Sequence, residues 1–408
     1  MKKVVIIEPN SAGVKLIDAS LRLGCKVYVL THNSGDRLIA SKHLQNCEVV
    51  VVDTNDEDAV KDKLLTINAV DHIDAIVPGF EYYVPLSSRM NALMGLRGLP
   101  VQTVMAMRYK HEMRRHLTER GVRSPAYTVV SSMDELVSAE NDIVFPCVLK
   151  PSHLAGSLYI KKLNNMDELK AHYAQLLSDG YTDLGYSMAG YTVIEEYISG
   201  REYSVEGYVH DGNITYVSVT DKFLGEEPHF VEMGHITRAR IDEESKKALM
   251  DYTASVVHAL NLNIGPFHCE MRLTDKGPVL IEIGARLVGD NISEIIELST
   301  GVSLAEKMVQ GYLGESITDY HFDDYRCHSG VRFLYGKEGA QFNGFTGLNE
   351  VTNMPGFVRF SPLMEIGSVI PAFTDFRARI GEVVFVAETQ EEVRESLDCA
   401  VRLLQLIL

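Results

Sequence analysis

The chain has 408 residues, of which 39 are Lys or Arg and 56 are Asp or Glu, so its formal charge is −17. Because phosphate-backbone binding depends on clustered Lys and Arg, this charge excludes a general affinity for nucleic acids. The length predicts about two to four domains. Six cysteines without C-x-x-C spacing favour neither a zinc ribbon nor a disulfide framework. The N-terminal apolar run is too short for a signal peptide, and no other run approaches about 18 apolar residues. We therefore expect a cytoplasmic protein with no membrane contact.

The first hundred residues alternate strand-like and helical patterns. Strands are predicted at 4–7, 26–30, 49–52 and 75–77, and helices at 12–23 and 60–65. This order predicts an open parallel sheet. The segment after the first strand is not G-x-G-x-x-G, and the second strand ends in Thr31-His32 without a ribose-binding acid. The pattern therefore does not indicate NAD or FAD binding.

The rest of the chain changes from mixed elements to mostly strands. A helix is predicted at 110–119, a strand starting at residue 125, a strand at 143–151 and a helix at 166–177, in a small lid-like segment. After residue 202 the predicted strands are 203–209, 214–220, 267–273 and 279–283, and a final helix covers 391–404.

Two carboxylates face each other on a predicted hairpin. If residues 275–277 form its turn, Glu270 and Glu282 are equidistant from that turn and lie opposite each other. Like charges placed in this way are destabilising unless something cancels them. Mg²⁺ would do so, since it typically takes one or two carboxylates together with substrate phosphates.

Strand periodicity separates the two faces of this hairpin. His268, Glu270 and Arg272 share a face with Glu282, Gly284 and Arg286, while Phe267, Cys269, Met271, Ile281 and Ile283 point the other way. A solvated polar face remains the alternative interpretation, because such faces are ordinary on antiparallel sheets.

Four further motifs precede the hairpin in a fixed order. They are YKHEMR (109–114), VLKPSHLAGS (148–157), EEYISGRE (195–202) and EMGH (232–235). In this order and spacing, with the hairpin, they resemble the ATP-grasp carboxylate–amine ligases. Within that family the chain looks most like the L-amino-acid ligases that make dipeptides.

The resemblance implies an α/β (α+β) ATP-grasp fold. Residues 1–105 would form a Rossmann-like parallel-sheet domain, and residues 106–200 linker helices and a lid subdomain. Residues 201–408 would form the C-terminal ATP-grasp domain, with an antiparallel sheet, the metal and substrate sites and a terminal extension.

The same resemblance assigns the ATP-binding residues. Lys110 and Lys150 would contact the phosphates, and a closing loop containing Ser152, Gly156 and Ser157 would cover them. Leu158-Tyr159 follows this loop where relatives commonly carry Gly-Val. The adenine hinge would comprise Glu195, Glu196 and the Ile198 backbone, and Glu202 would hold the ribose hydroxyls. Without the flanking motifs, each of these is an ordinary solvated charge or surface loop.

The metal and amino-acid sites follow from the last two motifs. Glu270 and Glu282 match the family's magnesium-binding glutamates, and Mn²⁺ could replace Mg²⁺ there. Gly284 stands where many relatives have Asn, so one metal ligand would be missing or replaced by water. Arg286 would contact the substrate carboxylate and the acyl phosphate, for which a guanidinium is suited. Glu232 would hold an α-ammonium, and His235 would contact substrate or assist proton transfer. Asp290 would shape the first substrate's pocket and favour a cationic side chain such as that of arginine.

The implied reaction phosphorylates the carboxylate of one amino acid and joins it to the amine of another, with Arg286, His235 and Lys150 as catalytic residues. Its partners would be amino acids and ATP, and the family implies a homodimer. Three alternatives stay open. These are an ATP-grasp ligase for a non-amino carboxylic acid, a nucleotide-binding protein without ligase activity, and a plain α/β ligand-binding protein.

Overall fold

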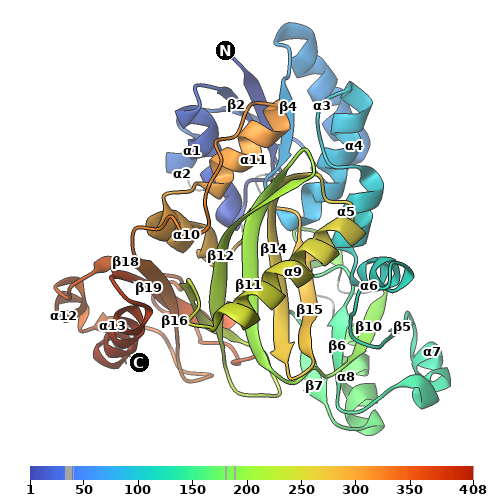
Figure 1. Ribbon diagram of the computed structural model, residues 1–408, viewed down its shortest axis with the longest axis vertical. Helices are drawn as coiled ribbons and strands as arrows, with labels where there is room; N and C mark the ends of the chain where they lie inside the picture. Colours follow the sequence, from blue (N-terminus) through green and yellow to red (C-terminus); the bar gives the residue numbers. More distant parts are fainter. Residues whose placement is uncertain (33–38, 40, 180–181, 188–189, 408) are drawn as a thin grey trace.

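Three larger β-sheets organise the chain, which the computed structural model describes over residues 1–32, 39, 41–179, 182–187 and 190–407. In Figure 1 the N-terminal sheet and its helices form the upper part, and the large sheet runs through the centre. A smaller sheet lies at the lower right, and the C-terminal helix lies at the lower left.

The N-terminal sheet is parallel, with the strand order β3-β2-β1-β4. Its strands are β1 (Lys3–Ile7), β2 (Lys26–Thr31), β3 (Glu48–Val51) and β4 (Ala75–Pro78). The helices of this part are η1 (Ser11–Gly13), α1 (Val14–Arg22), α2 (Ser41–Leu44), α3 (Glu57–Val70), η2 (Glu81–Tyr83), α4 (Val84–Met94) and α5 (Val101–Arg108). The helix predicted at 12–23 begins as the 3₁₀ turn η1, where Gly13 lies so close to Gly79 that a Cβ would overlap its carbonyl.

The smaller sheet is antiparallel, with the order β5-β10-β6-β7. Its strands are β5 (Tyr127–Val130), β6 (Cys147–Pro151), β7 (Lys161–Leu163) and β10 (Thr192–Glu196). The other elements here are α6 (Lys110–Glu119), α7 (Met133–Ser138), η3 (Glu140–Asp142), α8 (Met166–Ser178), β8 (Thr182–Asp183) and β9 (Tyr186–Ser187). The strand predicted at 143–151 begins only after Pro146, which has no N–H for a ladder.

The large sheet is antiparallel, with the order β15-β14-β11-β12-β13-β16-β19-β18. Its strands are β11 (Arg201–His210), β12 (Asn213–Leu224), β13 (Glu232–Thr237), β14 (Ile264–Thr274), β15 (Gly277–Gly284), β16 (His328–Tyr335), β18 (Phe357–Pro362) and β19 (Arg379–Ala387). The remaining elements are α9 (Glu243–Ala259), α10 (Ile292–Thr300), α11 (Leu304–Leu313), β17 (Gly344–Thr346), α12 (Leu348–Thr352), η4 (Phe376–Ala378), α13 (Gln390–Leu403) and β20 (Gln405–Ile407). Helix α9 crosses the front of β11, β14 and β15 (Figure 1).

One hydrophobic core connects the N-terminal sheet to the large sheet. It joins Val4 and Ile6 of β1 to Phe267, Cys269 and other buried residues of the large sheet. Helix α11 packs against β14 on one side and against α1 and β4 on the other. The two sheets are therefore held together by continuous apolar packing, which fixes the position of β14 relative to the N-terminal part.

The hairpin of β14 and β15 places Glu270 directly opposite Glu282, as predicted. The turn itself differs: Thr274 pairs with Gly277, so Asp275 and Lys276 form a two-residue turn. A β-bulge then inserts Ile281, which restores the pairing of the carboxylates. Because of this bulge, Ile281 lines the cavity described below and does not point into the core, so that part of the prediction was wrong.

The parallel N-terminal sheet, the smaller sheet and the large antiparallel sheet confirm the predicted α/β (α+β) class. The domain boundaries at residues 105 and 200 stay predictions. Within the described part of the chain, no helix has both the length and the apolar character needed to cross a bilayer.

Candidate active site

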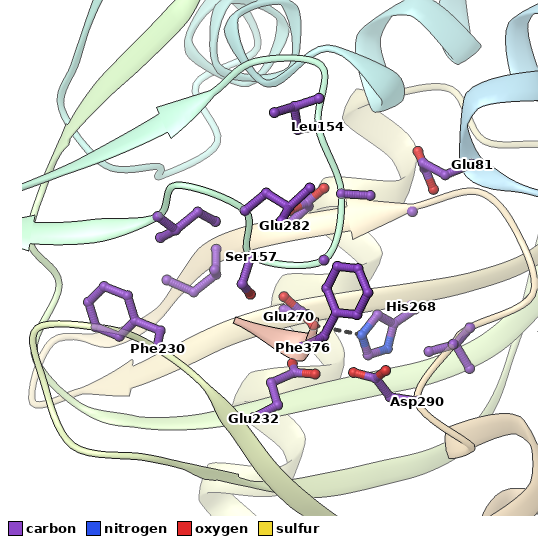
Figure 2. Close-up of a pocket in the computed structure, with 18 of the residues that line it drawn as sticks. Glu81, Leu154, Ser157, Phe230, Glu232, His268, Glu270, Glu282, Asp290 and Phe376 are labelled. Carbon is purple, nitrogen blue, oxygen red and sulfur yellow. Dashed lines mark hydrogen bonds and ion pairs between the residues drawn. The ribbon is translucent and has the colours of Figure 1, made fainter. Parts of the chain in front are cut away.

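A cavity of about 240 Å³ lies where the three sheets meet. Its walls come from the loop after β4, the loop after β6 and the edge of the large sheet. Figure 2 shows Glu270 and Glu282 near its centre, Glu232 and Asp290 below them, and the ring of Phe376 among these side chains. All of the predicted site residues line this cavity except Ser152 and His235.

The two hairpin carboxylates are both neutralised by cations of the chain. Glu270 accepts from Lys222 and, at 2.8 Å, from His268 Nε2. Glu282 accepts from Lys110 Nζ at 3.1 Å. Burial alone would raise the pKa of Glu270, but Lys222 and His268 outweigh burial and lower that pKa. Two facing carboxylates at a cavity wall are a donor set that fits a hard divalent cation.

The second predicted phosphate lysine, Lys150, is anchored by a buried carboxylate. Its Nζ donates to Glu195 Oε2 at 2.7 Å, and Arg114 Nε donates to Glu195 Oε1 at 2.6 Å. Burial alone would raise the pKa of Glu195, but Arg114 and Lys150 lower it to about 2. Arg114 also donates to the carbonyl of the bulged Ile281 at 2.7 Å. The Glu195 carboxylate therefore holds two cations in place, and both of its oxygens are in use.

The loop after β6 contains one predicted residue that faces away from the cavity. Ser152 Oγ lies 2.6 Å from His111 Nδ1, on the side of α6. Gly156 has a φ of +75°, and a Cβ placed on it would lie 2.8 Å from the ring of Phe376. Lys110 Nζ donates to the Leu154 carbonyl at 2.9 Å, which ties the loop to α6.

The predicted adenine hinge is arranged around Arg272. This arginine donates to the Ile198 carbonyl at 2.8 Å and to Glu202 Oε2 at 3.1 Å. The Glu196 side chain accepts from the Ala126 N–H at 2.9 Å and thus fastens β10 to the start of β5. Ile198 and Glu202 both line the cavity.

Lys222 joins three parts of the site. It is almost fully buried and lies 2.6 Å from Glu232, 3.4 Å from Glu202 and in direct contact with Glu270. Burial would lower the pKa of Lys222, but Glu232, Glu270 and Glu202 raise it well above its ordinary value. One ammonium on β12 therefore balances acids predicted for the substrate, ribose and metal sites.

His268 lies between two carboxylates on the same sheet. Its Nδ1 is 2.9 Å from Glu206 Oε1 and its Nε2 is 2.8 Å from Glu270 Oε1. Burial would lower the pKa of His268, but hydrogen bonds to Glu206 and Glu270 raise it to about 9. This side chain is therefore a second cation that orients Glu270.

Arg286 is paired with an acid from the N-terminal part of the chain. Its Nε donates to Glu81 of η2, and its Nη1 donates to the Leu287 carbonyl at 2.9 Å. Burial would raise the pKa of Glu81, but Arg286 outweighs burial and lowers it. A Cβ placed on Gly284 would lie 3.7 Å from Glu81 Oε2, so the Glu81 carboxylate lies beside the position that a side chain at residue 284 would occupy.

The predicted amino-acid pocket contains a histidine behind two acids. Glu232, His235 and Asp290 offer ligand atoms within 4.8 Å of one another. The His235 ring is fully buried, with its Nε2 3.6 Å from Glu232 and 3.9 Å from Asp290. Burial would lower the pKa of His235, but Asp290 and Glu232 raise it. Arg379 binds both oxygens of Asp290, at 2.6 and 3.0 Å. Arg379 occupies both oxygens of Asp290 and the His235 ring does not line the cavity, so this group offers a metal ion fewer open ligand atoms than the Glu270–Glu282 pair does.

Several residues of the site were missed by sequence reasoning. They are Glu81, Arg114, Lys222 and Arg379. Arg114 ends the YKHEMR motif but received no role from it, and Glu81, Lys222 and Arg379 lie outside every motif. Their contacts depend on how separate elements pack, as in the pairs Arg114–Glu195 and Arg379–Asp290. His268 and Arg272 were placed on the polar face of β14 by its two-residue period, which is the only local signal that found them.

Comparison with known families defines the class of protein. Residues 143–294 match the ATP-grasp domain, and residues 332–408 match the L-amino acid ligase C-terminal domain 2. The structure is similar to that of an L-amino acid ligase from Bacillus licheniformis, with a TM-score of 0.85 and 22% identity over 100% of this chain and 98% of that chain. The fold is therefore the ATP-grasp fold, and the resemblance to the ATP-grasp carboxylate–amine ligases is confirmed.

The relatives in sequence include ligases whose names specify amino-acid substrates. The chain is 23% identical to an L-arginine-specific L-amino acid ligase of Bacillus subtilis, over 85% of this chain and 83% of the relative. It is 25% identical to an alanine–anticapsin ligase of Bacillus subtilis, over 62% of this chain and 57% of the relative. The chain thus contains an ATP-grasp domain followed by an L-amino acid ligase C-terminal domain 2.

Proposed function

We propose that the protein is an ATP-dependent ligase that forms a dipeptide from two amino acids, with ADP and phosphate as the other products. One observation carries this proposal: Glu232 and Asp290 line the same cavity as the Glu270–Glu282 pair, Arg286 and the two lysines Lys110 and Lys150. A nucleotide and an amino acid would therefore share one enclosed space, as transfer of a phosphoryl group between them requires.

The nucleotide would lie along the smaller sheet. Lys110 and Lys150 would contact the phosphates, and the loop carrying Gly156 and Ser157 would cover them, with Ser152 supporting the loop from behind. The Ile198 backbone would face adenine and Glu202 would hold the ribose. Because the Glu195 carboxylate is bound on both oxygens, its role would be to hold Lys150 in position rather than to contact the base.

Glu270 and Glu282 would hold Mg²⁺ or Mn²⁺, which supplies neutralisation of charge on the phosphates when bound. Lys110 now pairs with Glu282 and Lys222 with Glu270. Lys110 lines the cavity and would act on the phosphates together with the ion, whereas Lys222 does not line the cavity and would act by holding Glu270.

Arg286 and Glu232 would hold the reacting amino acid. Arg286 would bind the carboxylate and later the acyl phosphate, since a planar guanidinium is suited to both anions. Glu232 would bind an α-ammonium. His235 does not line the cavity, so any part it takes in proton transfer would pass through Glu232, 3.6 Å away.

The proposed reaction has two steps. An oxygen of the first substrate's carboxylate attacks the γ-phosphorus of ATP, and the bond to ADP breaks to give an acyl phosphate. The amine of the second substrate then attacks the acyl carbon, phosphate leaves with the electron pair of the C–O bond, and the amine gives up a proton. Water must be excluded throughout, because the acyl phosphate would hydrolyse; the loop over residues 152–157 is placed to do this.

The test is phosphate release from ATP and Mg²⁺, scanned over all pairs of the common amino acids with mass detection of products. We expect release only with particular pairs, together with a dipeptide mass. Glu282→Gln should abolish it, whereas the exposed Glu338→Gln, a matched control, should not. Turnover for no pair would contradict the proposal and favour a non-amino carboxylic acid or a nucleotide-binding role. The homodimer implied by the resemblance stays a prediction, for which sedimentation is the measurement.

A further inference from the structure

The end of the amino-acid pocket is closed by an arginine from the C-terminal part of the chain. Arg379, the first residue of β19, binds Asp290 through two parallel hydrogen bonds, Nη1 to Oδ1 at 2.6 Å and Nη2 to Oδ2 at 3.0 Å. Its Nη2 also lies 3.5 Å from Glu232, and its guanidinium stacks 3.7 Å from the ring centre of Phe333. Arg379 lines the cavity, and its side chain is 10% exposed.

The position of this arginine is fixed from both sides. Asp290 and Asn291 have left-handed backbone conformations, with φ of +53° and +59°. Asn291 Nδ2 donates to Glu382 Oε2 of β19 at 2.6 Å. The turn at residues 290–291 is therefore attached to β19 at two points, and the Asp290–Arg379 pair is one of them. A bidentate guanidinium–carboxylate pair has a defined geometry, which resists reorientation.

The segment just before Arg379 also restricts the cavity. Phe376 lies in the cavity wall close to Gly156 and packs against the core of the smaller sheet (Figure 2). Only two residues separate Phe376 from Arg379. A short piece of the C-terminal part thus contacts the nucleotide-side loop at one end and the amino-acid pocket at the other, which leaves the arginine little room to swing aside.

The charges in this pocket oppose a second positive charge on a substrate. Glu232, Asp290 and Arg379 together carry a formal charge of −1, and Lys222, which contacts Glu232, is shared with Glu202 and Glu270. An α-ammonium bound at Glu232 therefore leaves no acid of this group without a cation. A cationic side chain would then add an uncompensated charge beside a buried guanidinium, where like charges repel strongly. Arg379 already binds both oxygens of Asp290, so Asp290 does not offer an open carboxylate to a cationic substrate side chain. The predicted preference for a side chain such as that of arginine depends on such a carboxylate.

Resting on the proposed function, we propose that Arg379 is a specificity-determining residue that excludes cationic side chains from the pocket at Asp290 and admits neutral ones. Arg379 acts by occupying Asp290. Removal of its charge would expose an acid at the same place and make the pocket attractive to lysine or arginine side chains.

The test compares two amino acids of nearly equal shape, the cationic arginine and the neutral citrulline. We expect kcat/KM of the wild-type protein to be higher for citrulline than for arginine by about tenfold or more. In Arg379→Met, the ratio of the citrulline value to the arginine value should fall by about tenfold, to near one or below. The double variant Arg379→Met with Asp290→Asn should return the preference to citrulline. Arg201→Met is the matched control: it removes another arginine of the large sheet that binds one acid, Asp221, at both oxygens, outside the cavity, and should leave the ratio unchanged.

A wild-type preference for arginine, or an unchanged ratio in Arg379→Met, would overturn this inference. If Arg379→Met does not fold, Arg379→Gln removes the charge but keeps a donor for Asp290, and the same ratio applies. Failure of the proposed function is distinguished by calorimetry. A protein with no turnover should still bind citrulline more tightly than arginine, with the order changed in the variant. If the wild-type protein binds neither probe, the assignment of this pocket is wrong.

Discussion

Replacing Glu195 with Gln should destabilise the protein more than the same change at its neighbour Glu196. Glu195 is 2% exposed and accepts charged hydrogen bonds from Lys150 and Arg114. A neutral amide can accept from one of these cations, but its NH₂ group faces the other. The substitution therefore leaves a buried cation without its partner, which is among the more costly changes in a protein interior.

The magnitude follows from the pKa of Glu195, which the two cations lower from its ordinary 4.5 to about 2. A shift of this size corresponds to about 3 kcal/mol of free energy of unfolding at neutral pH. Loss of one partner from a buried ion pair costs about 3 to 5 kcal/mol, which agrees. Because the pKa is lower in the folded state, the contribution is complete above about pH 4.5 and is lost as the pH falls towards 2.

The assay is urea unfolding followed by circular dichroism at pH 7 and at pH 3.5, since the chain has no tryptophan. Glu195→Gln should lower the free energy of unfolding by about 3 kcal/mol at pH 7, and the difference from wild type should narrow by about 1 kcal/mol at pH 3.5. Glu196→Gln keeps an amide oxygen that can still accept from the Ala126 N–H and loses only the charge of the acceptor, so it should cost at most about 1 kcal/mol. Equal losses in the two variants at pH 7 would refute the reasoning.

The remaining predictions concern a buried histidine, a glycine beside an aromatic ring and a hairpin carboxylate. Burial lowers the pKa of His172 to about 4, so its NMR titration should have a midpoint far below 6.5, and stability should fall as the pH drops from 6.5 towards 4. A midpoint near 6.5 would show that the ring is solvated. Gly156→Ala should reduce ATP-dependent phosphate release by about tenfold, because its Cβ would lie 2.8 Å from Phe376. The control is Gly24→Ala, because Gly24 has a similar φ of +73° but no atom within 4 Å of an added Cβ; it should cost only about 1 kcal/mol of stability. A tenfold loss of phosphate release in this control would show that the contact with Phe376 is not the cause. Mg²⁺ added with ADP should raise the Tm of the wild-type protein but not of Glu282→Gln, and an equal rise in both would remove Glu282 from the metal site.

The elements of the fold could be predicted where the chain's own periodicity decides them. Helix α6 covers the residues predicted for it, and the strands of the N-terminal sheet differ from prediction by one residue or so at their ends. The opposition of Glu270 and Glu282 was also correct, although the predicted turn was one residue longer than the observed one. Two local differences, the shorter turn and the bulge at Ile281, cancel, and a pattern-based argument cannot see either of them separately.

The electrostatics of the site could not be predicted from local patterns. Asp290 reads as a free acid in the sequence, but β19 brings Arg379 to it from 89 positions later in the chain. His235 reads as a cavity residue, but it lies behind Glu232 and is fully buried. Such pairings depend on the order of strands in the large sheet, which periodicity within one strand does not encode.

The bulge at Ile281 has a consequence for movement in the site. It turns a carbonyl of the hairpin towards Arg114, which holds Glu195, which in turn holds Lys150. Lys150 is therefore linked to the hairpin by three short contacts through α6 and not through the loop that follows β6. Under the proposed function, opening of that loop to exchange nucleotide would leave Lys150 held by Glu195, so admission of substrate and preservation of the catalytic geometry would be separate properties of this molecule.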